Sequence, residues 1–176
     1  MNKVLKELFS LGIYILCILG LTFLVIKFVG QRTVVDGSSM ETTLQNGDSL
    51  WVDKISYRFK GPERFDVIVF PHDDVYLIKR VIALPGERIR IDENGNIYIN
   101  GEKLEEDYGR EVIDADHIGV AWEDIQLGDD EYFVMGDNRN NSTDSRYPIV
   151  GNIKKSRITG KAVIRIWPFS KFGKFR

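Results

Sequence analysis

Three segments hold residue types that could perform covalent chemistry. The first is Gly37–Met40 (GSSM), which carries Ser38 and Ser39. A serine hydroxyl becomes an effective nucleophile only when a neighbouring base removes its proton. A glycine beside it lets backbone N–H groups approach an oxyanion. Taken alone, the segment also fits a plain Gly/Ser loop, so a catalytic interpretation requires a base elsewhere in the chain.

A candidate base is Lys79, in the apolar run Val75–Leu84 (VYLIKRVIAL). The run predicts a strand whose two faces are apolar except for one cation each, Lys79 and Arg80. Such a strand could lie at a sheet edge, where both cations reach water and discourage aggregation. Alternatively, Lys79 is buried, and desolvation lowers its pKa from about 10.4 to about 7–8, which makes it a competent general base.

The third segment is Gly136–Pro148 (GDNRNNSTDSRYP), which follows an apolar run. Its Asn, Asp, Ser and Gly residues are typical of a surface loop. The same residues could instead form a hydrogen-bonded network that positions other groups. The two histidines, His72 and His117, lie in probable surface segments, so a Ser-His-Asp triad is disfavoured.

Composition narrows the class of protein further. The 176 residues are 43% hydrophobic and 28% charged. This composition is typical of a globular protein and excludes a disordered chain. The net charge of -2 disfavours a nucleic-acid partner. A single cysteine, Cys17, cannot form an intrachain disulfide or a zinc cluster, and two histidines make a His-rich metal site improbable. We therefore expect no metal and no cofactor.

The most apolar part of the sequence is its beginning. Leu8–Ile26 contains no charged residue and is long enough, as a helix, to cross a bilayer. It is longer than the apolar core of a cleaved signal peptide, and it lacks the polar face of a buried globular helix. We predict a transmembrane anchor over residues 8–29, a cytoplasmic N-terminus over 1–7, and an extracytoplasmic domain over 30–176, an orientation that the flanking lysines favour only weakly.

The remaining sequence must supply the elements that position Ser39 and Lys79. Short apolar or alternating runs separated by turn residues predict many strands and little helix. The clearest is Glu87–Asn100, which predicts a hairpin with a tight primed turn at Asn94-Gly95. Residues 102–126 are polar and aperiodic, and no element is assigned to them. The expected fold is mainly β, a barrel or sandwich with one N-terminal transmembrane helix.

Taken in order, these segments resemble type I signal peptidases of the single-span form found in Gram-positive bacteria. GSSMETTL resembles the nucleophile box, GDSLWV the next box, and FDVIVF with YLIKRVIALPGE the lysine box. GDNRNNSTDSR resembles the final box, and GKAVIRIWPF also fits. The family pattern has a proline where this chain has Thr42, which puts the geometry of the nucleophile loop in doubt.

The resemblance implies a serine endopeptidase of the cell membrane that removes signal peptides from secretory preproteins. Substrates would be cut after small residues at the first and third positions before the bond. Ser39 would be the nucleophile, and Lys79 would be the general base and then the acid for the leaving amine. Its partners would be preproteins and membrane lipid, with no nucleic acid.

The resemblance also implies supporting roles. Ser142 would orient the lysine, while Asp144 with Arg146, and Asp137 with Arg80, would form structural ion pairs. The Ser39 N–H would contribute to the oxyanion hole, whose second donor is uncertain. The oxyanion and substrate-pocket residues would be Gly37, Ser38, Met40, Val35 and Ile78.

Three rival functions are weighed against this one. A non-catalytic assembly factor on the same fold would tend to lack the serine or the lysine, and both are present, although Thr42 keeps this alternative alive. A self-cleaving Ser-Lys repressor would need a DNA-binding domain in place of the apolar segment, and the first 30 residues exclude such a domain. A membrane-anchored β domain that only binds partners would leave Lys79 and the polar loop without a role.

Overall fold

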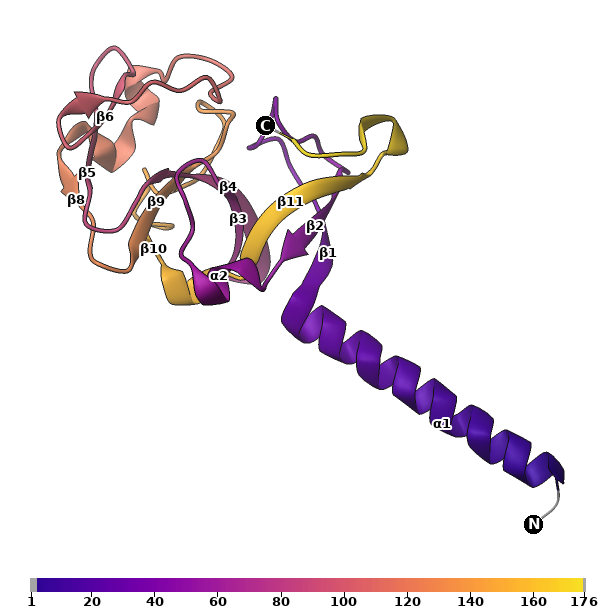
Figure 1. Ribbon diagram of the computed structural model, residues 1–176. Coiled ribbons are helices and arrows are strands. Elements are labelled where there is room, and N and C mark those ends of the chain that lie inside the picture. The colour runs from indigo at the N-terminus through magenta and orange to yellow at the C-terminus, as the bar shows by residue number, and fades with distance from the viewer. Residues whose placement is uncertain (1–2, 176) are drawn as a thin grey trace.

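The apolar N-terminal segment is one helix that stands clear of the rest of the protein (Figure 1). In the computed structural model, which describes residues 3–175, α1 (Lys3–Leu24) continues into a π-helical turn, η1 (Val25–Val29). Neither element buries a side chain. By length and composition, Lys3–Val29 is long enough to cross a membrane. The helix thus begins five residues before the predicted span.

The rest of the described chain is built mainly from antiparallel strands. The larger sheet has seven strands in the order β1-β2-β11-β3-β4-β9-β10. Their bounds are β1 Gly30–Val34, β2 Ser49–Asp53, β3 Val67–His72, β4 Val75–Ala83, β9 Glu131–Met135, β10 Ile153–Lys154 and β11 Gly160–Trp167. A short helix, α2 (Ser56–Phe59), follows β2. The predicted β-rich class with one N-terminal apolar helix is confirmed.

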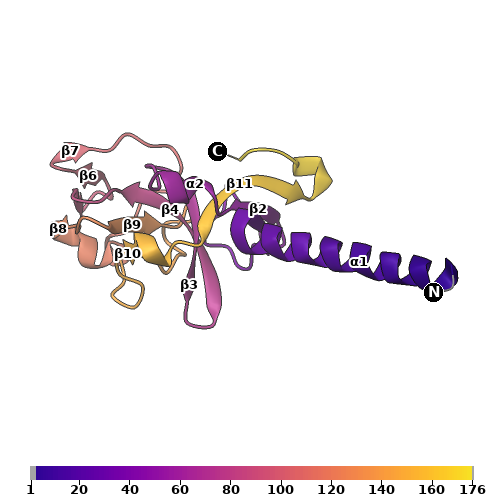
Figure 2. The same ribbon diagram turned by 60° about the horizontal axis from the view of Figure 1, so that its bottom comes forward.

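A second sheet lies at the end of the domain that is far from α1 (Figures 1 and 2). Its four strands run in the order β7-β6-β5-β8. They are β5 Arg88–Ile91, β6 Ile97–Ile99, β7 Glu102–Lys103 and β8 Ile125–Gln126. Short 3-10 turns complete the described fold: η2 Ala115–His117, η3 Gly119–Trp122, η4 Lys155–Arg157 and η5 Phe169–Lys171.

The predicted hairpin is present, but its turn differs from the expected one. Strands β5 and β6 pair from Ile89↔Ile99 to Ile91↔Ile97, which leaves a loop between them that is longer than two residues. Of the two turn residues, only Gly95 has a positive φ, 76°, whereas a primed turn needs a positive φ at both. The Asp92 carboxylate closes the loop instead, because it accepts the backbone N–H groups of Asn94 and Asn96.

The segment 102–126, unassigned from sequence, folds back over the β5–β6 hairpin. Its buried Ile113, Ile118 and Ala121 pack in one cluster with Ile82 and Phe133 of the large sheet. This cluster joins the two sheets. The segment therefore forms part of the core around the polar loop that follows β9.

Strand β4 lies inside the large sheet and not at its edge. It pairs with β3 from Val75 to Arg80 and with β9 from Arg80 to Ala83. Both Lys79 and Arg80 are only 2% exposed. The alternative in which both cations of this strand reach water is therefore wrong, because both side chains are buried.

Candidate active site

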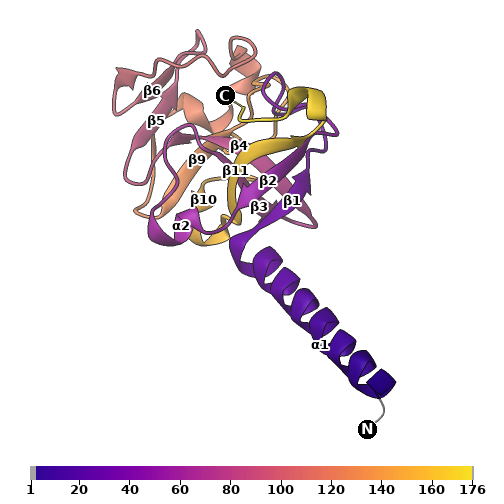
Figure 3. The ribbon, with the colours of Figure 1, turned by 45° about the vertical axis from the view of Figure 1, so that its right-hand side comes forward.

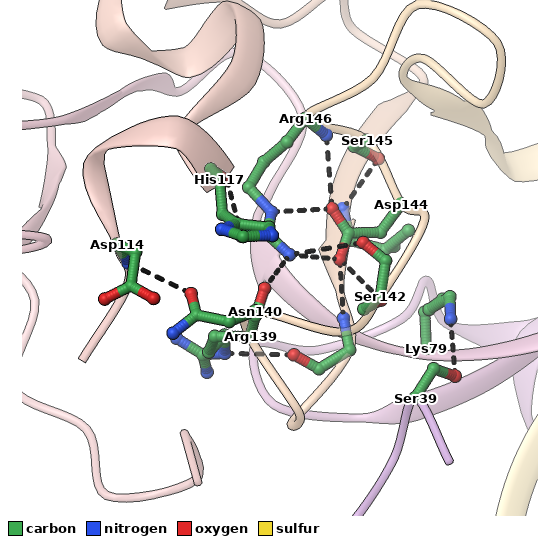
Figure 4. Close-up of polar contacts among 12 residues, drawn as sticks. Ser39, Lys79, Asp114, His117, Arg139, Asn140, Ser142, Asp144, Ser145 and Arg146 are labelled. Carbon is green, nitrogen blue, oxygen red and sulfur yellow. Dashed lines mark hydrogen bonds and ion pairs between the residues drawn. The ribbon is translucent and has the colours of Figure 1, made fainter. Parts of the chain in front are cut away.

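Ser39 and Lys79 meet although they are far apart in sequence. Ser39 lies in the loop between β1 and β2, and Lys79 is in the middle of β4. The Lys79 Nζ donates a hydrogen bond of 2.7 Å to the Ser39 Oγ (Figure 4). This is within the reach that proton transfer between a nucleophile and its base requires.

Burial changes the acid–base behaviour of Lys79. Desolvation lowers the pKa of its ammonium to about 8 from the ordinary value of 10.5. The Asp144 carboxylate opposes this shift, the Arg146 guanidinium adds to it, and Asp137 opposes it again. About a tenth of Lys79 is therefore neutral at pH 7 and about half at pH 8, and the neutral amine is the form that a general base needs.

The loop that carries Ser39 is held by the polar loop after β9. The Asn138 backbone N–H donates to the Ser39 carbonyl oxygen at 3.1 Å, and its side-chain Nδ2 donates to the Ser38 carbonyl oxygen at 3.1 Å. The Asn141 Nδ2 donates to the Ser38 Oγ at 3.0 Å. Gly37, with a φ of 99°, starts the loop in a conformation that favours glycine.

These contacts also determine where the Ser39 N–H points. In a trans peptide the C=O and N–H lie on opposite sides, and the Ser38 carbonyl faces Asn138. The Ser39 N–H therefore points away from the polar loop. Within residues 3–175 it has no hydrogen-bond acceptor, so this donor is available for an oxyanion.

A buried carboxylate, Asp144, organises the polar loop. It accepts two hydrogen bonds of 2.8 Å from the Arg146 guanidinium, one of 2.7 Å from the Ser142 hydroxyl, and one of 3.0 Å from the Gly136 N–H (Figure 4). Asp144 and Arg146 have fully buried side chains. The bond from Ser142 to Asp144 fixes the serine beside the site, and a direct bond from Ser142 to Lys79 stays a prediction.

Gly136 occupies a position where no side chain fits. A Cβ built on it would overlap both the Ser142 hydroxyl and the Ser39 carbonyl oxygen. The nucleophile loop and Ser142 therefore both pack directly against the backbone of Gly136.

The second expected ion pair is also present. The Arg80 guanidinium forms two hydrogen bonds with Asp137, of 2.8 Å and 2.7 Å, and both side chains are buried. Its third nitrogen donates to the Phe65 carbonyl oxygen at 2.9 Å. The guanidinium also lies 3.8 Å from the centroid of the Tyr108 ring. This cation therefore ties β4 to the polar loop directly behind Lys79.

Sequence reasoning missed several supporting residues in 102–126. The Glu106 carboxylate pairs with Arg139 at 2.7 Å, and the Arg110 side chain pairs with Glu41, beside the nucleophile, at 3.1 Å. Tyr108 covers Arg80, as described above. Because this segment is polar and aperiodic, nothing in its pattern indicated which side chains turn inward.

Three of the five predicted pocket residues pack together. Val35, Met40 and Ile78 are buried in the same apolar cluster as Leu44. Ser38 is in direct contact with the polar loop, as described above. Their contact with a substrate stays a prediction. Thr42 is exposed, between the buried Met40 and Leu44 that anchor the loop.

The histidines lie away from the Ser39–Lys79 contact. His72 pairs with Asp73 at 3.7 Å, and His117 pairs with Asp116 at 2.9 Å. Asp114, Asp116 and His117 could together offer three ligand atoms to a metal ion. Exposed acidic groups often lie this close without an ion, and the cluster is separate from Ser39 and Lys79 (Figure 4).

An antiparallel β domain in which a buried lysine of lowered pKa contacts a serine hydroxyl has the geometry of a serine hydrolase with a lysine base. Residues 8–167 match the family model described as "Signal peptidase, peptidase S26". The chain therefore belongs to the signal peptidase family, and it is a serine endopeptidase. The resemblance recognised from the sequence motifs is confirmed.

Individual relatives agree with this family. A probable signal peptidase I-2 of Synechocystis is 39% identical over 83% of this chain and 67% of its own. Signal peptidase I S of Bacillus subtilis is 37% identical over 88% of this chain and 86% of its own. A crystal structure of a signal peptidase I from Enterococcus faecalis is 33% identical, covers 59% of this chain and 98% of its own, and has a TM-score of 0.49. Family membership implies that secretory preproteins are the substrates.

Proposed function

We propose that this signal peptidase is membrane-bound and cuts preproteins after small-x-small sites, with Ser39 as nucleophile and Lys79 as general base. The observation that carries the proposal is the 2.7 Å contact between the Lys79 Nζ and the Ser39 Oγ. The lowered pKa of Lys79 supports the same roles, because a lysine that stayed charged could not accept the serine proton.

Acylation takes place in two steps. The neutral Lys79 amine takes the proton of the Ser39 hydroxyl while the Oγ attacks the carbonyl carbon of the scissile bond. The Ser39 N–H, which the Asn138 contacts direct away from the polar loop, stabilises the resulting oxyanion. The Lys79 ammonium then donates its proton to the leaving nitrogen, the C–N bond breaks, and the signal peptide is left as an ester on Ser39.

Deacylation reverses these roles with water. Lys79, neutral again, takes a proton from a water molecule, whose oxygen attacks the ester carbon. The ammonium returns that proton to the Ser39 Oγ as the ester bond breaks, and the signal peptide leaves with a free carboxylate. No other proton carrier is required, so the two histidines have no part in the cycle.

The apolar helix supports the membrane location. Lys54 ties β2 to the end of this helix, through its Nζ to the Ile26 carbonyl oxygen at 3.0 Å and its backbone N–H to the Val29 carbonyl oxygen at 3.0 Å. A span over α1 and η1 would therefore hold the domain at the bilayer surface, where signal peptides also end. We place the N-terminus in the cytoplasm and residues 30–176 outside it. Proximity of this kind raises the effective concentration of the scissile bond.

The experiment is a cleavage assay with the full chain in neutral detergent and a preprotein that has a small-x-small site. The wild type should cut at that site, the Ser39→Ala variant should not, and both should have the same circular dichroism. Ser170→Ala is the matched control, because Ser170 is exposed in η5. Cleavage by Ser39→Ala at the wild-type rate would refute the assigned nucleophile. Absence of cleavage by the folded wild type on several preproteins would favour the non-catalytic alternative.

A further inference from the structure

A basic cavity lies where the apolar helix joins the β domain, outside the catalytic site. Its volume is about 610 Å³, and four cations line it: Lys27, Lys54, Arg58 and Lys155. One carboxylate, Asp130, faces them. The cations come from η1, from the residue after β2, from α2 and from η4, so the cavity exists only in the folded chain.

The cavity has a fixed place relative to the end of the helix. Lys54 donates hydrogen bonds to the Ile26 and Val29 carbonyl oxygens, as described above. Lys27 lies between these two residues, in the helical turn η1. Figures 1 and 3 show α2 and the exit of α1 on the same side of the domain. A ligand bound there would therefore lie level with the end of the apolar helix.

The charges in this cavity are not neutralised within the protein. Among residues 3–175, none of the four cations forms an ion pair. Lys27 and Arg58 instead lie over the Phe28 ring, each 5.3 Å from its centroid. Clustered cations repel one another, so an anion bound among them is favoured.

We propose that this cavity binds the phosphate of an anionic phospholipid in the leaflet next to the β domain. The inference rests on the proposed membrane anchor, because the end of a spanning helix lies at the depth of the headgroups. A free phosphate would satisfy the same cations. The lipid is preferred because the cavity adjoins Phe28 and the fully exposed apolar surface of α1, along which acyl chains would lie.

The test is native mass spectrometry of the full chain in neutral detergent, with dioleoyl-phosphatidylglycerol, dioleoyl-phosphatidylcholine and inorganic phosphate added in separate titrations. The test variant is Arg58→Gln with Lys155→Gln. The Arg58 and Lys155 side chains form no ion pair within residues 3–175, so their replacement breaks none. The matched control of this variant is Arg90→Gln with Lys103→Gln, which removes the same two charges from the small sheet far from α1. Melting temperatures check that each variant is folded.

The wild type and the control should bind phosphatidylglycerol more tightly than phosphatidylcholine. Because each basic residue near a membrane surface contributes about fivefold, the test variant should lose this preference by about 20–30-fold. Equal binding of both lipids by the wild type, or equal loss in test and control variants, would overturn the proposal. Binding of inorganic phosphate as tight as that of phosphatidylglycerol would also overturn it, in favour of a free-phosphate site.

Preprotein cleavage by the wild type is measured in parallel in the same detergent without added lipid. Cleavage together with no lipid preference would reject the lipid site and leave the peptidase function standing. A lipid preference without cleavage would reject the function and leave the site standing. The two proposals can therefore fail separately.

Discussion

Replacing Lys79 by methionine should abolish cleavage and, at neutral pH, stabilise the fold. The two effects have one cause, since the buried amine that acts as base is costly to keep protonated. Methionine has a similar length and no charge, so it removes this cost while filling most of the same volume. A residue that served only to hold the fold together would show the opposite change in stability.

The magnitude follows from the two pKa values of Lys79. The group has a pKa of about 8 when folded and an ordinary value of 10.5. The difference corresponds to about 3 kcal/mol that opposes folding at any pH where both the folded and the unfolded chain keep the proton. Because the folded pKa is the lower one, the folded chain binds fewer protons between pH 8 and 10.5, and its stability rises with pH across this window. Below pH 8 the full cost is present.

The assay is thermal unfolding of the full chain in neutral detergent, followed by tryptophan fluorescence from pH 6 to 11. Other groups also titrate in this range, so the quantity compared is the difference in Tm between Lys79→Met and wild type at each pH. This difference should fall by about 6–12 °C between pH 7 and 11, because about 3 kcal/mol shifts the Tm of a domain this size by that amount. Any change in packing is independent of pH and cancels from the trend.

Lys103→Met is the control, because Lys103 is exposed on β7. Its difference from wild type is the baseline with which the trend of Lys79→Met is compared. A flat difference for Lys79→Met relative to this baseline would mean that Lys79 titrates normally in the folded protein, and it would refute the reasoning from burial. An increase with pH would contradict the sign.

Three further predictions concern the same site. The cleavage rate should rise with pH and be half-maximal at about 8, because neutral Lys79 is the active form; a rate independent of pH from 6 to 10, with chemistry limiting, would contradict the base assignment. Gly136→Ala should abolish cleavage and lower stability by about 1–3 kcal/mol in denaturant unfolding, since its Cβ overlaps Ser142 and the nucleophile loop; an active variant would show that the loops can separate. Asp144→Asn should destabilise the chain by about 3–5 kcal/mol, because Arg146 is left buried without its charge partner; unchanged stability in the same unfolding experiment would mean that water reaches this pair.

The catalytic candidates could be recognised from the sequence because their chemistry leaves local signals. Ser39 sits in a short Gly/Ser motif, and Lys79 interrupts an apolar strand, where a charged residue stands out. The order of the four boxes then restricted the family. The apolar run that contains α1 was equally visible, since its length and lack of charge are properties of consecutive residues.

The supporting network could be predicted only in part. The pairs Asp144–Arg146 and Asp137–Arg80 are implied by the family resemblance, and both ion pairs form in the structure. The contribution of Glu106 was invisible, because a glutamate in a polar, aperiodic segment looks the same whether it faces solvent or a buried arginine. The bond from Ser142 to Asp144 likewise depends on how one loop folds on itself.

Consecutive residues in this chain determined the apolar helix, most strands and the identity of the chemical groups, because periodicity and composition act over a few neighbours. Tertiary structure alone decided whether Lys79 is an edge residue or a buried base. Burial depends on β3, which precedes β4 directly in the chain, and on β9, which comes from a distant part of it. The same packing brings the Ser39 Oγ, 40 residues away, to 2.7 Å from the Lys79 Nζ. Desolvation and contact are properties of this assembled environment, and they turn an ordinary lysine into a candidate base.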